Sequence, residues 1–397
     1  MAHLDGVNRP RQHRRRHHRR QPGPDALRHT YREKAMSSYD PLRVAVIGCG
    51  GISGPYGASM RTKPEKVEIV GAYDMDAERA QAWAAENGGK AYASLDDLLA
   101  EPAIEAVVNL TIHHAHAEVN RAALNAGKHI HCEKPLATNL PDGRETVRLA
   151  EAADLRLSAS PFTFLGEAQQ TFFKALRDER IGKPMVVYSA MNWGRLEVWH
   201  GNAAAFYTRG VGPLFDVGVY ALTVLTTAFG PVSRVTGFGG IQQPRRTQQS
   251  GPREGSSFYV ETPDVVISGL EFANGMIGRL TASFLVGGAK DGSGTEVHGE
   301  NGALYLGSNH DFNCAVEIQS GREWEALPYV AEPHRGVEWG RAVFDLADSL
   351  RTVSPQRATG RQALHVLDVC VSTLESIEHG HPVSTTTHFE PPAPYYE

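Results

Sequence analysis

The sequence predicts an α/β domain with a parallel sheet, followed by a domain of α+β type with an antiparallel sheet. Apolar, β-rich runs alternate with helical segments from residue 42 to residue 161, and such alternation forms right-handed βαβ units. After Pro161, one long helical segment precedes strands that are joined by turn signals. A chain of 397 residues is long enough for two domains of ordinary size.

The first half of the chain contains five expected strands. Helices separate them, and the helix boundaries are marked by a capping Ser94 and by Gly88 and Gly127 near C-terminal ends. The strands lie within the runs 42–53, 67–74, 104–112, 129–135 and 155–162.

The second half begins with a helix over residues 166–182. Two hairpins are expected, one around Ala273-Asn274-Gly275 and one around Glu300-Asn301-Gly302. The polar segment 245–257 predicts a mobile loop. Two C-terminal helices are expected over 337–352 and 361–380.

Composition indicates a cytoplasmic protein. Apolar residues make up 41% of the chain, but no apolar run approaches the roughly 18 residues that cross a bilayer. The four cysteines form no CxxC pair, which is typical of free thiols in a reducing compartment.

Residues 1–40 are expected to form a disordered basic tail. Residues 1–35 hold nine arginines, one lysine and three acidic residues, so the rest of the chain is more acidic than the net charge of −5 suggests. Such a tail could be a nucleic-acid arm or a twin-arginine export signal, although no apolar segment follows it. We favour a solvated tail and expect no nucleic-acid partner, because the remaining chain is acidic.

A glycine-rich turn follows the first strand. Gly48 permits the tight turn, Gly50 and Gly51 let the backbone approach a pyrophosphate, and Ile52 and Ser53 open a helix whose N-terminus attracts anions. The third position of the G-x-G-x-x-G pattern is therefore Ser53 rather than glycine. The alternative is a tight turn with no ligand.

Asp74 ends the second strand, where a carboxylate can accept hydrogen bonds from the adenosine ribose and repel a 2′-phosphate. The cofactor is therefore expected to be NAD rather than NADP. The alternative is a helix-capping or turn aspartate, and Arg79 lies close enough to soften the preference.

Two further segments carry a resemblance to a known family. The run 111–139 contains a threonine and a histidine, then Ala-Gly-Lys-His and Glu-Lys-Pro, and the run 212–225 contains an Asp-x-Gly-x-Tyr element. Together they resemble the Gfo/Idh/MocA family, named for glucose–fructose oxidoreductase, inositol dehydrogenase and rhizopine catabolism. Ile112 and His113 depart from the family's usual Pro-Asn.

The resemblance implies a Rossmann NAD-binding domain over residues 41–161. It also implies a substrate-binding and oligomerisation domain over 162–397, built on a large, mostly antiparallel open sheet. Thr111, His116, Glu133 and Lys134 would contact the cofactor, with the last two beside the nicotinamide. Lys134, Asp216 and Tyr220 would be catalytic.

The chemistry of these side chains agrees with that assignment. Oxidation of a secondary alcohol releases a hydride to nicotinamide and a proton to a base. A desolvated lysine can hold the alkoxide-like oxygen, Asp216 can orient the hydroxyl, and the Tyr220 phenol can pass the proton beside a cation. The alternatives are a capping aspartate and a core tyrosine.

The stretch HIHCEKP (129–135) also contains metal-ligand residue types. Strand alternation places His129 and His131 on one face and Cys132 on the other, so no metal site is expected. The segment 191–210 holds Asn192, Arg195, Trp199 and His200, which could bind a sugar or pack a loop.

The sequence thus predicts an NAD-dependent dehydrogenase acting on CH–OH groups. Its substrate would be a sugar, sugar derivative or cyclitol, and it would form a homo-oligomer through the C-terminal sheet. One alternative is an NAD-dependent glycosidase that oxidises its substrate transiently, and another is a non-catalytic NAD-binding regulatory protein.

Overall fold

The computed structural model describes residues 40–285, 287–290 and 292–396. The basic tail that we expect over residues 1–40 lies outside the described residues, apart from Asp40. None of the described helices is long and apolar enough to span a lipid bilayer. All four cysteines are free thiols, in agreement with the sequence prediction.

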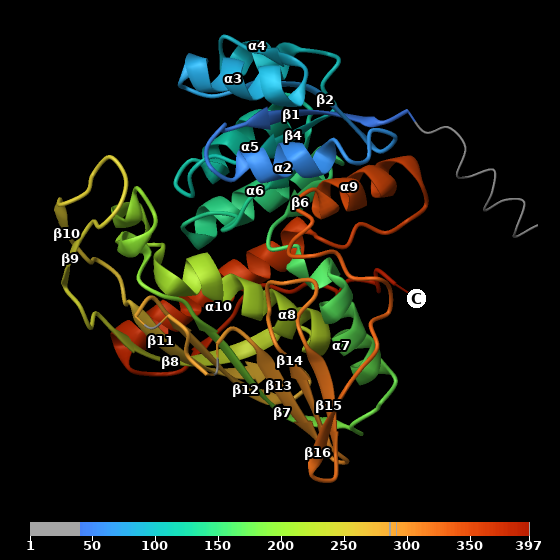
Figure 1. Ribbon diagram of the computed structural model, residues 1–397, viewed down its shortest axis with the longest axis vertical. Coiled ribbons are helices and arrows are strands. Elements are labelled where there is room, and N and C mark those ends of the chain that lie inside the picture. Colours follow the sequence, from blue (N-terminus) through green and yellow to red (C-terminus); the bar gives the residue numbers. More distant parts are fainter. Residues whose placement is uncertain (1–39, 286, 291, 397) are drawn as a thin grey trace, which may run out of the picture. The chain divides into compact units, whose positions relative to one another are not determined.

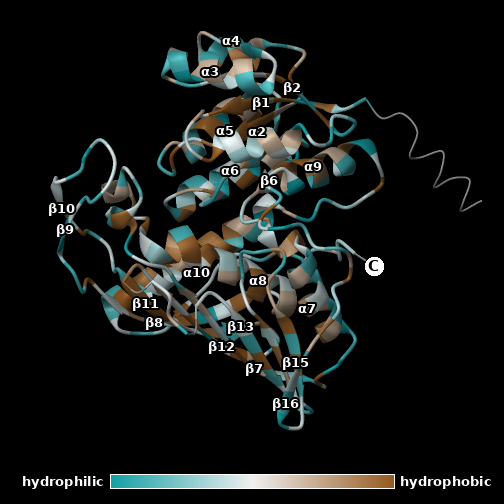
Figure 2. Ribbon diagram, in the orientation of Figure 1, coloured by the Kyte–Doolittle hydropathy of each residue, from teal (hydrophilic) through white to brown (hydrophobic). Residues whose placement is uncertain are grey.

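The N-terminal half forms a six-stranded, fully parallel sheet with the strand order β3-β2-β1-β4-β5-β6. Its centre is apolar because β1 and β4 are covered on both faces, and β1 is brown in Figure 2. The strands are β1 (Leu42–Ile47), β2 (Val67–Tyr73), β3 (Lys90–Ala91), β4 (Ala106–Asn109), β5 (His129–Cys132) and β6 (Leu157–Ala159).

Helices connect these strands, and capping side chains mark the start of three of them. Asp76, Ser94 and Asn139 each accept a backbone N–H at the start of α3, α4 and α6, and so satisfy amides that the helix cannot. The helices are α2 (Ser53–Met60), α3 (Ala77–Asn87), α4 (Leu95–Ala100), α5 (His116–Asn125) and α6 (Leu140–Ala152).

The C-terminal half forms a nine-stranded sheet, order β16-β15-β14-β13-β7-β12-β11-β8-β17, in which only β7 and β12 pair in parallel. Both predicted hairpins are confirmed as β11–β12 and β13–β14. The strands are β7 (Pro184–Asn192), β8 (Val232–Gly240), β11 (Val265–Phe272), β12 (Ile277–Ser283), β13 (Thr295–Gly299), β14 (Ala303–Leu306), β15 (Val316–Ser320), β16 (Glu323–Ala326) and β17 (Val383–Ser384).

Three helices cover one face of this sheet: α7 (Glu167–Arg177), α8 (Val219–Phe229) and α10 (Gly360–His379). Helix α10 also packs against α6 and β6, so it lies between the two sheets (Figure 1). The fold class predicted from the sequence is therefore confirmed.

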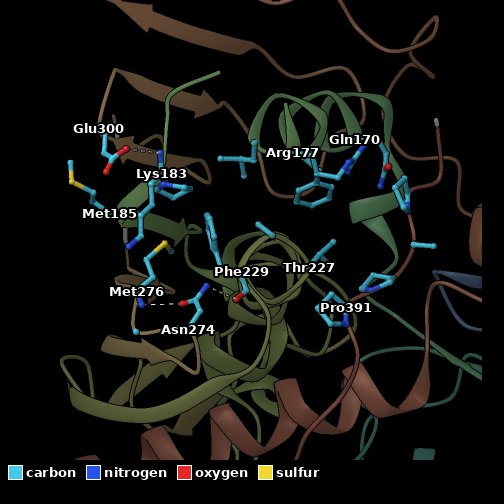
Figure 3. Close-up of a pocket in the computed structure, with 18 residues that line it drawn as sticks. Gln170, Arg177, Lys183, Met185, Thr227, Phe229, Asn274, Met276, Glu300 and Pro391 are labelled. Carbon is cyan, nitrogen blue, oxygen red and sulfur yellow. Dashed lines mark hydrogen bonds between the residues drawn. The ribbon is translucent and has the colours of Figure 1, made fainter. Parts of the chain in front are cut away.

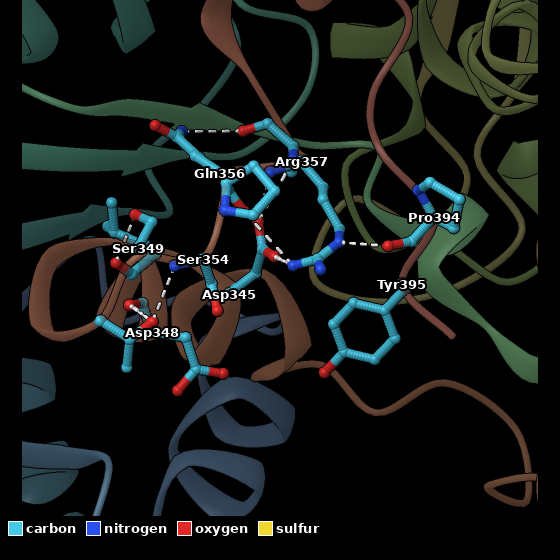
Figure 4. A network of polar contacts seen from close by, with 12 residues as sticks. Asp345, Asp348, Ser349, Ser354, Gln356, Arg357, Pro394 and Tyr395 are labelled. Atoms are coloured by element: carbon cyan, nitrogen blue, oxygen red, sulfur yellow. Dashed lines mark hydrogen bonds and ion pairs between the residues drawn. The ribbon is translucent and has the colours of Figure 1, made fainter. Parts of the chain in front are cut away.

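One late helix returns to the first sheet. Helix α9 (Arg341–Arg351) packs against β2, β5 and β6, close to α2 (Figure 1). Its Asp345 accepts from the Arg357 backbone N–H (2.7 Å) and pairs with the Arg357 guanidinium (2.9 Å), which also donates to the Pro394 carbonyl (2.9 Å; Figure 4). We still propose a domain boundary near Pro161, where the parallel strands end.

The predicted loop over residues 245–257 is wrong at its two ends, where the structure has strands. The segment begins and ends in two short antiparallel strands, β9 (Arg245–Thr247) and β10 (Ser257–Tyr259). Arg246 is fully buried and pairs with Glu197 (2.9 Å) and with Asp264 (2.7 Å). Local composition could not show this, because both partners come from distant parts of the chain.

Breaking this buried triad should destabilise the fold. Arg246→Met leaves two carboxylates buried without a cation, and we expect the free energy of unfolding to fall by about 3–5 kcal/mol. The matched control is Arg234→Met, because Arg234 pairs with Glu271 at the surface with 55% of its side chain exposed. That variant should lose about 0–1 kcal/mol. Urea denaturation measures both, and equal losses would mean that the triad does not anchor the segment.

Candidate active site

Three loops meet at one edge of the parallel sheet. They follow β1, β4 and β5, and the strand order reverses between β1 and β4, which is where ligands bind in open α/β sheets. A cavity of about 560 Å³ lies there and is also lined by residues of the C-terminal half. The predicted site residues that line it are Gly50, Gly51, Ile52, Thr111, His116, Glu133, Lys134, Asp216 and Tyr220.

The glycine-rich turn has the geometry of a phosphate cradle. Gly48 has φ of +94°, and a Cβ there would lie 2.8 Å from the backbone of Leu110, so only glycine fits. A Cβ at Gly50 or Gly51 would meet no atom within 4 Å, so their backbone faces open space. No side chain caps the first turn of α2, but Pro55 has no N–H and the Ser53 N–H donates to the Gly50 carbonyl (3.1 Å), so only part of this turn is left to bind an anion. These residues fit a dinucleotide pyrophosphate.

Asp74 lies next to this turn without lining the cavity. One of its carboxylate oxygens accepts from the Cys49 backbone N–H (2.8 Å) and the other from the Asp76 backbone N–H (2.9 Å). The helix cap is Asp76, not Asp74. Arg79 pairs with Asp76 (3.1 Å). Asp74 thus holds the glycine turn and keeps lone pairs for a further donor.

His116 joins the loops after β4 and β5. Its Nδ1 lies 2.7 Å from the Pro135 carbonyl and its Nε2 lies 3.0 Å from the Thr111 carbonyl. Burial lowers the pKa of His116, whereas the two carbonyl acceptors favour the protonated ring, because a neutral imidazole can donate to only one of them. Asn109, which sequence reasoning missed, accepts from the Thr111 hydroxyl (2.7 Å) and fixes the loop.

Lys134 and Asp216 form an ion pair that joins the two halves of the described chain. The Lys134 ammonium also donates to the Asp216 carbonyl (2.9 Å). Asp216 lies in a π-helical turn, Leu214–Gly218, which leads directly into α8. Burial disfavours the ammonium, but the negative charges of Asp216 and Glu133 outweigh it and raise the pKa of Lys134. The lysine is therefore a firmly held cation.

Tyr220 follows Asp216 by four residues and shares the site. The Lys134 ammonium lies 5.5 Å from the centre of its ring. Lys134 lowers the pKa of Tyr220, as expected, but burial outweighs that effect and raises it. In the described state the phenol is therefore protonated and can only donate or accept a hydrogen bond.

A buried polar network lies behind Glu133, and its members Tyr56, Ser158 and Ser160 were not found from the sequence. Glu133 accepts from the Tyr56 hydroxyl (2.7 Å), the Ser160 hydroxyl (2.9 Å) and the Lys134 backbone N–H (3.0 Å). Tyr56 lies 3.0 Å from His131 Nε2, and His131 Nδ1 lies 2.9 Å from the Ser158 hydroxyl. A neutral His131 that donates through Nε2 satisfies every partner.

The two histidines of HIHCEKP therefore serve protein hydrogen bonds. His129 Nδ1 accepts from the Arg156 backbone N–H (2.9 Å). Among the described residues, no group of three or more histidine, cysteine, aspartate or glutamate side chains is placed to hold a metal ion.

Aromatic side chains line the same cavity as the glycine turn. Trp199 and His200, which the sequence singled out, line the cavity, whereas Arg195 does not and Asn192 lines a neighbouring one. Sequence reasoning missed the remaining aromatic lining, because most of it comes from loops without a motif. These residues are His113, Trp193, Phe206, His310 and Trp339.

A larger cavity of about 730 Å³ lies elsewhere (Figure 3). Arg177, Lys183, Met276 and Pro391 are among its lining residues, and none of the predicted site residues reaches it. The smaller cavity is the candidate active site, because it combines the glycine turn with titratable side chains.

Comparisons with known proteins agree with this geometry. Residues 42–160 match the model of the oxidoreductase family with an NAD-binding Rossmann fold, and residues 170–305 match the GFO/IDH/MocA C-terminal domain. The chain is 30% identical to 1,5-anhydro-D-fructose reductase from Ensifer adhaerens over 248 residues, 61% of this chain and 68% of that protein. It is 28% identical to trans-1,2-dihydrobenzene-1,2-diol dehydrogenase from Danio rerio over 47% of this chain and 56% of that protein.

Solved structures share the fold. The WlbA dehydrogenase from Bordetella pertussis, in complex with NADH and UDP-GlcNAcA, superposes with a TM-score of 0.72 at 22% identity, covering 87% of this chain and 99% of that one. The chain belongs to the Gfo/Idh/MocA oxidoreductase family.

The buried network makes stability depend on pH. Burial lowers the pKa of His131 from 6.5 to about 4, so the unfolded chain binds a proton first as pH falls. The neutral His131 makes its full contribution to the free energy of unfolding above pH 6.5. This contribution is lost as pH falls from 6.5 toward 4, and the loss is at most about 1.4 kcal/mol per pH unit. His131→Gln keeps a donor and an acceptor, and its unfolding free energy should fall less over this window.

Denaturation at several pH values measures the effect. The matched control is His381→Gln, because His381 is exposed and should leave the wild-type pH profile unchanged. Parallel profiles for wild type and His131→Gln would show that His131 is not held neutral.

Proposed function

We propose that the protein is an NAD-dependent oxidoreductase. It would transfer a hydride between nicotinamide and a secondary alcohol or ketone of a sugar, sugar derivative or cyclitol. The observation that carries the proposal is the Lys134–Asp216 pair with Tyr220, placed in the cavity that the glycine turn also lines.

The described residues fit a dinucleotide. Gly50, Gly51 and the start of α2 would hold the pyrophosphate, because their backbone faces open space. Asp74 would accept from the adenosine ribose. Thr111, His116 and the Glu133–Lys134 pair would border the nicotinamide. When bound, NAD supplies the hydride acceptor.

Lys134 would handle the proton. Its ammonium can donate a hydrogen bond to the substrate oxygen and stabilise negative charge on it. The raised pKa favours the protonated lysine, which is the form that protonates a ketone oxygen in reduction. In oxidation the lysine must first become neutral, and the positive charge of an oxidised cofactor would help it lose its proton. Asp216 would orient the substrate hydroxyl.

Relatives support a carbohydrate or cyclic diol as substrate. The name of the Ensifer adhaerens relative is that of an anhydrosugar reductase, and the Bordetella pertussis dehydrogenase was crystallised with a nucleotide sugar. The Danio rerio relative is named for a cyclic diol. A ring with vicinal hydroxyl groups is common to these molecules, and the aromatic and polar lining of the cavity suits it.

We also propose that the protein forms a homo-oligomer through the C-terminal sheet. Large apolar side chains from neighbouring strands of this sheet are exposed, and such a surface is typical of an interface. They are Tyr188 on β7, Phe238 on β8, Ile267 on β11 and Ile277 on β12.

Cofactor preference tests the role of Asp74. Wild type should bind NAD more tightly than NADP, and Asp74→Ala should shift the ratio of dissociation constants toward NADP by roughly tenfold or more. The ratio is compared because the variant also loosens the glycine turn and so weakens the binding of both cofactors. Fluorescence titration measures it. Asp96→Ala, the same charge change on the exposed surface of α4, should keep the wild-type ratio. If wild type already prefers NADP, Asp74 does not lie at the ribose.

Turnover tests Lys134. Lys134→Met removes the cation and keeps the apolar stem, so NAD binding should persist while turnover falls roughly 10²–10⁴-fold. Lys174→Met removes an exposed lysine of α7 and should not change turnover. Tyr220→Phe should lower turnover less than Lys134→Met does if the lysine takes the proton. Wild-type turnover should survive a chelator.

Accumulation of NADH in step with ketone would separate a dehydrogenase from the glycosidase alternative, which returns its hydride. Turnover that chelation abolishes and Lys134→Met spares would overturn the proposal.

A further inference from the structure

A second cavity, of about 500 Å³, adjoins the candidate active site. Trp193, Trp199 and His310 line both cavities. The residues that line only the second one include Asn192 at the end of β7 and Ser308 and Asp311 after β14. A ligand bound over Lys134 can therefore extend past the shared aromatic side chains into this space.

The shared tryptophans are exposed. Trp193 has 38% and Trp199 has 56% of its surface accessible, although both are large apolar side chains. Exposed apolar surface of this kind marks a binding surface. A flat indole offers its face to the C–H groups of a pyranose ring, and burial of that face against a ring is favourable.

Polar groups complete the second cavity. The Asn192 side-chain carbonyl accepts from the Ser283 hydroxyl (3.1 Å), and its amide N–H₂ has no acceptor among the described residues. The Ser308 oxygen accepts from the backbone N–H groups of His310 and Asp311 (both 3.1 Å), which leaves its own proton free. These groups are suited to hydroxyl groups of a ligand.

The charge of the second cavity selects against anions. None of the described residues that line it is a lysine or an arginine. Asp311 pairs with His310 (3.1 Å), and 53% of its side chain is exposed. The hydrogen bond from His310 lowers the pKa of Asp311, so its carboxylate is ionised and repels a phosphate or a second carboxylate.

We propose that the second cavity binds a second, uncharged sugar ring, so that the substrate is a two-ring glycoside whose first ring reacts over Lys134. This inference rests on the proposed function for the reaction of the first ring. It adds the size and charge of the substrate: a neutral disaccharide or a glycosylated cyclitol, rather than a single ring or a sugar phosphate. Trp193 and Asp311 are the specificity-determining residues.

The test compares one-ring and two-ring probes on the full-length protein. The probes are methyl glucoside, methyl galactoside and methyl mannoside, and neutral disaccharides with the same three reacting rings. For the best ring, kcat/KM for NADH formation should be at least roughly tenfold higher with the disaccharide than with the methyl glycoside. Trp193→Ala should reduce this ratio by a similar factor. Equal values for the two probes would overturn the inference.

Matched variants separate the second cavity from general damage. Trp324→Ala removes a tryptophan of β16 with the same 38% exposure that lines neither cavity, so it should leave the ratio unchanged. Asp311→Asn keeps the shape and removes the charge. It should raise the relative affinity for a disaccharide with a carboxylate on its second ring. A ratio that falls equally in Trp193→Ala and Trp324→Ala, or tightest binding of glucose 6-phosphate to wild type, would contradict the inference.

Binding distinguishes this inference from the proposed function. Calorimetric titration of the NADH-loaded protein with each disaccharide needs no turnover. Disaccharide binding that depends on Trp193 but yields no NADH in the kinetic assay would support the second cavity and overturn the proposed reaction. NADH formation with equal affinity for one-ring and two-ring probes would support the reaction and overturn the second cavity.

Discussion

The ion pair between Lys134 and Asp216 joins two parts of the chain that are 82 positions apart. Both side chains are largely buried, and removal of one partner from such a pair leaves an uncompensated charge. The pair therefore fixes the edge of the parallel sheet against α8, and the cavity exists between these two elements. The proposed cofactor contacts and the aromatic side chains line this same cavity, so every proposed step of the chemistry depends on this contact.

Hydrogen bonds of the residues next to Lys134 hold the loop that carries this lysine in place. Glu133 accepts three hydrogen bonds, and the chain Tyr56–His131–Ser158 continues into the core. Because these groups satisfy one another, they hold the loop after β5 in its shape. On the open side, Gly50 and Gly51 line the cavity, and a Cβ at either would meet no atom within 4 Å. The hydrogen-bonded loop after β5 and the open space beside the glycine turn together suit a large dinucleotide and a ring-shaped substrate.

Much of the fold could be predicted because its signals are local. The structure confirms the strand runs, the caps Ser94 and Gly88 and both hairpin turns. Each of these features depends on residues that are close in sequence. The glycine turn was recognisable from its position between a strand and a helix. Asp216 and Tyr220 carry no local signal and were found through resemblance to a family. Arg246, Tyr56 and Trp339 were missed because distant partners decide their surroundings, and a polar segment can still bury a paired arginine.

The most direct measurement of the central claim is a crystal structure with oxidised NAD and a saturating neutral disaccharide. Our account predicts the nicotinamide between Thr111 and Lys134. The Lys134 ammonium should lie about 2.6–3.2 Å from one hydroxyl oxygen of the first ring, and the second ring should lie against Trp193. A nicotinamide outside this cavity, or a reacting hydroxyl held by groups other than Lys134, Asp216 and Tyr220, would contradict it.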